Sequence, residues 1–339
     1  MKKWILIFFG IALCAMTFEV HSQKNDQTAN VSIPAGFSEH AESHNLKAFS
    51  MATQNGKVIL KDAHGNNMFR CISNDNFTPD NVQIDSERGL ILQGTVTGEG
   101  PAGSQVPRER QQSGGVMSGK HFGDAFSYWS FVPKPPSNRI RVDIYATIPR
   151  PLGAKTGIWS FADDWYSGGG SLISLEMDMI EAGGRPDQYV DSTREGMFRY
   201  HPNLHSWFGG GSPWKHASIQ HTEAKNLYFG TEDTEHKMSI EWINGPSLKE
   251  KKLRYLIDDK VVYERSIADL KKQHPKLERG EKTVESTMNA QEIAEFMWDK
   301  PQNLQLWYGA DQDFWLSGTP QYGDDWPSEM IIRRIDVFR

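Results

Sequence analysis

Apolar and polar residues alternate along most of the chain, in short runs bounded by Gly, Pro, Asn or Asp. In the clearest run, residues 138–148, Ile and Val at every second position alternate with charged or aromatic residues. This period of two is that of a strand with one buried face. Such runs cover residues 57–62, 89–96, 138–148, 236–243, 253–264 and 330–338. Their spacing predicts an all-β sandwich of two antiparallel sheets, and Ile257–Lys260 reads as a hairpin turn.

Three other segments depart from this alternation. Residues 23–39 show no apolar periodicity, which predicts a loose N-terminal lead-in to a single domain over residues 40–339. Pro residues stiffen the segment 131–139, which predicts a loop. Residues 266–300 are charged and helix-prone, which predicts an inserted segment with surface helices between two late strands.

The first 22 residues have the pattern of a secretory signal peptide. Two lysines precede the apolar run Trp4–Met16, which at about 13 residues is too short to span a membrane. We therefore expect a secreted or periplasmic protein. Leu13 before Cys14 favours export without a lipid anchor at that cysteine. Cys71 would then be the single remaining cysteine, so an intramolecular disulfide is excluded.

Composition narrows the classes of partner. The net charge of −6 argues against nucleic acid, whose phosphates require a basic surface. The chain has 11 Trp, 10 Tyr and 17 Phe although its hydrophobic fraction is only 38%. This excess of aromatic residues fits either a large β core or a surface on which sugar rings stack. We expect a monomer with no membrane span.

The stretch "SLISLEMDMIEAGG" (residues 171–184) places Glu176, Asp178 and Glu181 within six positions. Glu176 and Asp178 alternate with Leu and Met, so the acids face away from the core. Glu181 follows Asp178 by an odd step, which on a regular strand would turn it inward. One inserted residue, a β-bulge, would return Glu181 to the acidic face, and bulges are frequent beside active sites.

This geometry suggests a pair of catalytic carboxylates with a helper. Counting the bulge as one step, the Cα atoms of Glu176 and Glu181 lie about 13 Å apart, and their side chains can converge. The carboxyl groups can then approach the ~5–5.5 Å of a retaining glycosidase. Glu176 would attack the anomeric carbon, Glu181 would protonate the leaving oxygen, and Asp178 would assist. The alternative is a solvent-facing strand that happens to be acidic.

The acidic stretch resembles the E-x-D-x-x-E signature of glycoside hydrolase family 16. Other segments resemble the family in the same order along the chain: "QQSGGVMSGKHF" (111–122), "TGIWSF" (156–161), "HKMSIEWI" (236–243), "LRYLIDDKVV" (253–262) and "WPSEMIIRRIDVFR" (326–339). Asp259 stands where the family hairpin usually has Gly. The segment "LQLWYGADQDFW" (304–315) is more similar to that of agarases and porphyranases than to that of β-1,3-glucanases.

The resemblance implies a concanavalin-like jelly roll with a concave substrate cleft and endo-acting, retaining hydrolysis of a β-linked polysaccharide. It implies Glu176 as nucleophile, Asp178 as assisting acid and Glu181 as acid/base, without a cofactor in catalysis. It also implies a structural Ca²⁺ on the convex face, with Asp336 as a ligand. For the substrate, a red-algal galactan such as agarose, porphyran or carrageenan comes first and a β-1,3-glucan such as laminarin second.

Residues near the signature or in the agarase-like segment are candidates for binding sugar by stacking or hydrogen bonding. They are Trp159, Trp165, His205, Trp207, Asp311 and Trp315. Each of these aromatic or His residues can equally be part of the core. Arg194 and Arg199 are candidates for a sulfate contact, with plain surface as the alternative. His201 and His205 are four residues apart, but Pro202 and the strand pattern argue against a helical metal site.

Two other classes of protein remain open. A carbohydrate-binding lectin can use the same sandwich, although it has no need of two converging glutamates. A polysaccharide lyase can also use a jelly roll, but it relies on Tyr, His and Arg around an acidic sugar, and no clear group of these is visible in the sequence.

Overall fold

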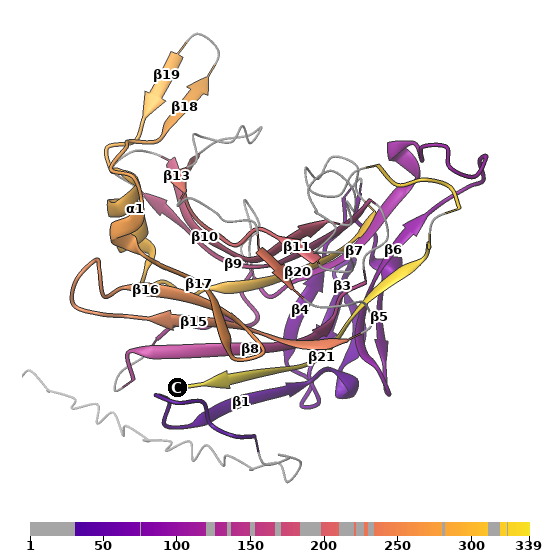
Figure 1. Cartoon of the computed structure of the whole chain (residues 1–339), viewed down its shortest axis with the longest axis horizontal. Helices are drawn as coiled ribbons and strands as arrows, with labels where there is room; N and C mark the ends of the chain where they lie inside the picture. Colours follow the sequence, from indigo (N-terminus) through magenta and orange to yellow (C-terminus); the bar gives the residue numbers. More distant parts are fainter. Residues whose placement is uncertain are drawn as a thin grey trace, which may run out of the picture. The chain divides into compact units, whose positions relative to one another are not determined.

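Two antiparallel sheets face each other across one continuous apolar core (Figure 1). The computed structural model describes residues 31–74, 76–119, 126–133, 137–149, 153–166, 171–183, 198–209, 220–221, 227–229, 234–279, 282–310, 319–323 and 325–339. Residues Ile33–Arg339 form one compact unit. The predicted signal peptide and most of the predicted lead-in lie outside the described residues.

We call the sheet that contains the acidic strand the front sheet. Its order is β13–β12–β10–β9–β20–β7–β4–β3–β2, and β11 and β14 continue beside the end of β10. These strands are β2 (Ser50–Gln54), β3 (Lys57–Lys61), β4 (Asn67–Cys71), β7 (Gln111–Met117), β9 (Ala154–Tyr166), β10 (Ser171–Gly183), β11 (Phe198–Tyr200), β12 (Asn203–Gly209), β13 (Gln220–His221), β14 (Leu227–Phe229) and β20 (Asn303–Ala310).

The other sheet is the back sheet, with the order β17–β16–β15–β8–β21 and, beyond β21, β1 and the pair β6–β5. These strands are β1 (His40–Asn45), β5 (Val82–Asp85), β6 (Gly89–Val96), β8 (Arg139–Thr147), β15 (Glu235–Ile243), β16 (Lys252–Ile257), β17 (Lys260–Ser266) and β21 (Ser328–Phe338). β6 also pairs with β7 and so joins the two sheets. The predicted two-sheet, jelly-roll β-sandwich is confirmed, and each of the six alternating runs forms a strand or a hairpin.

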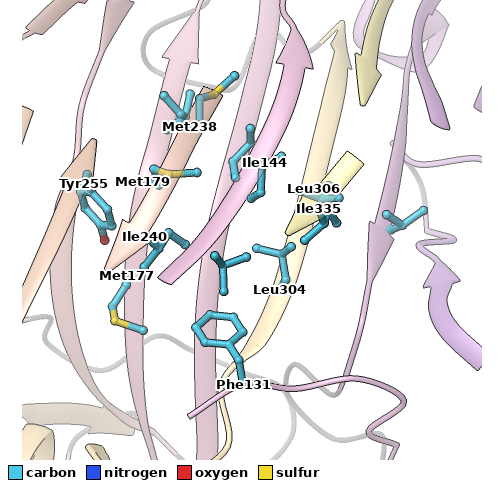
Figure 2. Close-up of a cluster of buried hydrophobic side chains, with 14 of the residues drawn as sticks. Phe131, Ile144, Met177, Met179, Met238, Ile240, Tyr255, Leu304, Leu306 and Ile335 are labelled. Atoms are coloured by element: carbon cyan, nitrogen blue, oxygen red, sulfur yellow. The ribbon is translucent and has the colours of Figure 1, made fainter. Parts of the chain in front are cut away.

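The core lies between the two sheets and explains the alternation in the sequence. Met177 and Met179 on β10 point toward Met238 and Ile240 on β15 (Figure 2). All four side chains are essentially inaccessible to solvent. Glu176 and Asp178 alternate with these methionines and face outward, so the core fixes the face on which the acids lie.

The predicted hairpin turn at Ile257–Lys260 joins β16 to β17. Asp258 and Asp259 both have positive φ, of 50° and 66°, which is the geometry of a type I′ turn. Asp tolerates this left-handed region better than most residues do, so the turn forms without the Gly that is more common there.

The charged segment 266–300 forms a 3₁₀ turn (Ile267–Asp269), the hairpin β18 (Lys276–Arg279) and β19 (Lys282–Glu285), and the helix α1 (Ala290–Met297). The helix begins at a capping box, in which Asn289 accepts from the backbone of Glu292 and the Glu292 carboxylate accepts from that of Asn289. Ile293 and Met297 of α1 are buried in the core. The helix is therefore part of the sandwich, whereas the hairpin stands out beside it (Figure 1).

The remaining helical turns are short 3₁₀ segments at Leu46–Ala48, Pro79–Asn81 and Arg108–Arg110. Among the described residues, none of the helices is long and apolar enough to cross a membrane. The concave cleft stays a prediction, because much of the chain that connects the front strands lies outside the described residues.

Candidate active site

The predicted β-bulge on the acidic strand is present. Along β10 and β9, Asp178 is opposite Trp159 and Ile180 is opposite Ile158, so Met179 is the extra residue. Met179 and Ile180 are both buried, with exposed fractions of 1% and 0%. Two successive residues therefore enter the core, and Glu181 returns to the outer face that carries Glu176 and Asp178.

The neighbouring strand β12 adds a histidine to the acids. His205 is opposite Glu176 in the register of β10 and β12. Its Nε2 atom lies 2.9 Å from Oδ2 of Asp178, and Asp178 also shares a hydrogen bond with Glu176. The predicted His205 is thus beside the acids, but its Nε2 contacts Asp178. A hydrogen bond from His205 to a sugar hydroxyl stays a prediction.

Burial determines the protonation states of this group. Burial raises the pKa of Asp178 well above its usual range, and its hydrogen bond with Glu176 opposes that rise. Burial and the like charge of Asp178 raise the pKa of Glu181 to about 8, so Glu181 holds its proton at neutral pH. Burial lowers the pKa of His205 to about 4, so its imidazole is neutral there. The contact between His205 and Asp178 is therefore the close approach of a neutral imidazole to a carboxyl group and not an ion pair.

The same set could be mistaken for a metal site. Atoms of Glu176, Asp178 and His205 lie within 4.8 Å of one another, close enough in principle for a divalent ion. A hydrogen bond already joins Asp178 to Glu176, and Nε2 of His205 lies 2.9 Å from Oδ2 of Asp178. We assign this set to proton chemistry and no metal to it.

Tryptophans flank the acids on the outer face of the front sheet. Trp159 on β9 is opposite Asp178, and its ring meets Trp307 of β20 edge to face, with centroids 5.1 Å apart. Trp207 on β12 is half-buried, and its ring stacks on His205 with centroids 5.6 Å apart. Trp159 itself is only 6% exposed, so in this structure it offers little surface on which a sugar could stack.

Gly157 has no side chain, so the outer face of the front sheet is open between the rings of Trp159 and Trp307. It is opposite Glu181 on β10 and Trp307 on β20. A Cβ atom at this position would lie 3.6 Å from Trp307 and 3.7 Å from Trp159, so Ala would fit but would fill the space between the rings. Glycine inside a strand often marks a place where another group approaches the backbone.

Lys155 is a residue of this face that the sequence prediction missed. It lies two residues before Gly157 and four before Trp159 on β9, so the three residues share one face of the strand. This spacing in the sequence would have predicted that Lys155 lies on the face of the site. The residue is only 8% exposed. Its Nζ lies 4.7 Å from the ring centroid of Trp307 and 5.3 Å from that of Phe77.

Several predicted site residues cannot be placed. Asp311, Trp315 and Arg194 lie outside the described residues. Trp165 and Arg199 lie on β9 and β11, but their side chains are outside the described part of the structure. Their roles stay predictions.

Asp336, the predicted calcium ligand, lies on β21 of the back sheet and is fully buried. Its carboxylate accepts from the Ser43 hydroxyl at 2.8 Å. It also lies 3.3 Å from Nε2 of His40 and 3.0 Å from Nε of Arg334. Calcium requires six to eight oxygen ligands, whereas two of these three partners are nitrogen donors and one is a permanent cation. The arrangement is that of an ion-pair network and does not fit calcium.

The sequence matches no protein-family model and no curated protein. The structure, by contrast, is similar to solved structures. An endo-1,3-β-glucanase from Streptomyces sioyaensis aligns with a TM-score of 0.52 at 13% identity, over 91% of this chain and 98% of that one. The β-porphyranase BpGH16B from the human gut bacterium Bacteroides plebeius aligns with a TM-score of 0.52 at 12% identity, over 91% and 94%. The chain therefore has the jelly-roll fold of glycoside hydrolase family 16.

Proposed function

We propose that the protein is a secreted, endo-acting, retaining glycoside hydrolase that cleaves internal β-linkages of a polysaccharide. The observation that carries this proposal is the bulge at Met179. It brings Glu181, which holds its proton at neutral pH, to the face that carries Glu176 and Asp178. A retaining glycosidase needs two carboxyl groups on one face, one of them protonated.

In the proposed reaction, the Glu176 carboxylate attacks the anomeric carbon while Glu181 donates its proton to the leaving glycosidic oxygen. The glycosidic C–O bond breaks and a glycosyl ester of Glu176 forms. Water then attacks the ester from the opposite side and gives its proton to Glu181, which restores both residues. Asp178, hydrogen-bonded to Glu176 and in contact with His205, assists by orienting the nucleophile.

The substrate class is proposed from the sequence. The segment 304–315 favours a red-algal galactan, and a β-1,3-glucan is the second choice. The fold supports both equally, because a glucanase and a porphyranase align with the same TM-score. The open cleft that the family resemblance implies has no wall that selects chain ends, so we expect oligosaccharide products.

A panel of polysaccharides tests the proposal. Agarose, porphyran, carrageenan and laminarin are each digested with the wild type and with Glu176→Gln, and new reducing ends are measured. We expect release of saturated oligosaccharides from at least one galactan by the wild type only. Unsaturated ends that absorb ultraviolet light would indicate a lyase. Binding without any release from any of the four would indicate a lectin, and cleavage of laminarin alone would overturn the galactan assignment.

A further inference from the structure

Lys155 lies one diagonal step from Glu181 on the outer face of the front sheet. In the register of β9 and β10, Gly157 is opposite Glu181 and Lys155 is opposite Gly183. Diagonal neighbours on one sheet face have Cβ atoms about 7–8 Å apart or less, within reach of a long side chain. On the other flank Lys155 is opposite Gly309 of β20. Neither directly opposite residue has a side chain, so no directly opposite side chain crowds the lysine on either flank.

Two aromatic rings fix the ammonium group. Its Nζ is 4.7 Å from the centroid of Trp307 and 5.3 Å from that of Phe77, and these rings contact each other with centroids 5.1 Å apart. Cations are attracted to the faces of aromatic rings at such distances. Gly115 on β7 permits this arrangement, because a Cβ there would lie 3.0 Å from the Phe77 ring. Lys155 is thus a held charge and not a mobile surface lysine.

We propose that Lys155 is a positioning residue whose fixed positive charge lets Glu181 serve both as the acid and as the base of the reaction. The proposal rests on the function proposed above, in which Glu181 first donates a proton and later accepts one from water. A carboxyl group that is only buried would hold its proton too tightly for the second step.

The charges that face Glu181 support this role. Asp178 and Glu176 lie on its own strand, His205 on β12 and Lys155 on β9, and the backbone N–H of His201 donates to the Glu181 carbonyl at 2.9 Å. Burial and Asp178 raise the pKa of Glu181 to about 8, while His205 and Lys155 oppose that rise. The pKa of His205 is lowered to about 4, so it is uncharged at neutral pH, whereas an ammonium group is charged there.

Two readouts test the proposal on the full chain. One is the titration of the Glu181 carboxyl carbon by ¹³C NMR, assigned by its loss in Glu181→Gln. The other is the basic limb of the pH profile of kcat/KM, where activity falls as Glu181 loses its proton. In Lys155→Met we expect both midpoints to rise by about one pH unit, the scale on which one nearby unit charge acts on a carboxyl group. Lys155→Arg should restore both midpoints to within about 0.3 pH units of the wild type.

Controls separate the possible failures. Lys260→Met removes an exposed lysine at the start of β17 in the back sheet and should move neither midpoint. Lys155→Gln replaces Lys155→Met if the latter does not fold. The role of Lys155 would be overturned if neither Lys155→Met nor Lys155→Gln moved the midpoints. It would also be overturned if Lys155→Arg moved the midpoints as far as the neutral variants do. The Glu181 midpoint can also differ between the wild type and Lys155→Met while the wild type hydrolyses none of the polysaccharides. That result would overturn the proposed function but would still show the electrostatic coupling between Lys155 and Glu181.

Discussion

Both sheets have buried carboxyl groups on their outer faces, but the partners of these groups differ between the two sheets. On the back sheet, Asp143 is 1% exposed and its Oδ1 lies 2.5 Å from Nε of Arg141. Glu241 lies 3.5 Å from Arg141 and 3.3 Å from Arg139. On the front sheet, Asp178 is 2% exposed, and its named partners are Glu176 and the neutral His205. Each described buried acid of the back sheet has an arginine in contact, whereas neither of these two neighbours of Asp178 carries a fixed positive charge.

This difference separates structural from chemical roles. Burial raises the pKa of Asp143, and the contact with Arg141 opposes that rise. The energy of such a buried pair depends on keeping both partners. A carboxyl group buried beside like charges keeps its proton to a higher pH than usual. A raised pKa of this kind is useful for proton transfer, and stability does not require it. We therefore expect substitutions on the front face to affect turnover and substitutions on the back face to affect stability.

The largest expected effect is on turnover. Glu176→Gln and Glu181→Gln should each lower hydrolysis by about 10²–10⁴-fold, because each removes a group that acts in the chemical step. The measurement is reducing-end release per folded molecule. Glu241→Gln is the matched control on the back face and should retain wild-type turnover. More than about a tenth of wild-type activity in either front-face variant would contradict the role of that residue.

The next effect is on stability. Arg141→Met should lower the free energy of unfolding by about 3–5 kcal/mol, because it leaves Asp143 buried without its cation. Arg141 also bonds Asp259 at 2.7 Å and the Ser239 hydroxyl at 3.0 Å. Urea unfolding followed by tryptophan fluorescence would measure the change. If Arg141→Met kept wild-type stability but lost turnover, the assignment of a structural role to the back face would be wrong.

A smaller effect concerns pH. The folded protein raises the pKa of Glu181 from 4.5 to about 8, so the stabilising contribution of this group is complete below pH 4.5 and is lost as pH rises to about 8. Glu181→Gln stays neutral and should become more stable than the wild type across that window, by on the order of 1–4 kcal/mol in total. Thermal unfolding at pH 5 and pH 8.5 would show this difference widening. An equal difference at both pH values would mean that Glu181 titrates normally.

Most of the fold could be predicted because the alternation of apolar residues records the core directly. The bulge could also be predicted, since Glu181 falls out of step with Glu176 and Asp178 unless a residue is inserted. The burial of Arg141 and Asp143 could not be read from the same pattern. Both lie at alternate positions that face away from the core. They are buried in contact with each other, and Arg141 also bonds Asp259, which is far away in sequence.

The candidate site was predicted only in part, for a similar reason. His205 was found through its place near the signature, but its contact with Asp178 depends on the register of β12 against β10. Lys155 was missed because the rings that contact its ammonium group, Trp307 and Phe77, belong to other segments of the chain. The calcium expectation came from the resemblance alone, and the nitrogen partners of Asp336 do not fit it.

Chemical rescue with azide tests the central claim most directly, namely that Glu176 and Glu181 act on opposite sides of one sugar ring. The substrate is an activated aryl β-glycoside of the oligosaccharide that the wild type releases. In Glu176→Ala, azide should displace the aryl group from the vacated side and give the α-glycosyl azide. In Glu181→Ala, azide should attack the Glu176 ester and give the β-glycosyl azide. The same anomer from both variants, or no rescue in either, would contradict the assignment.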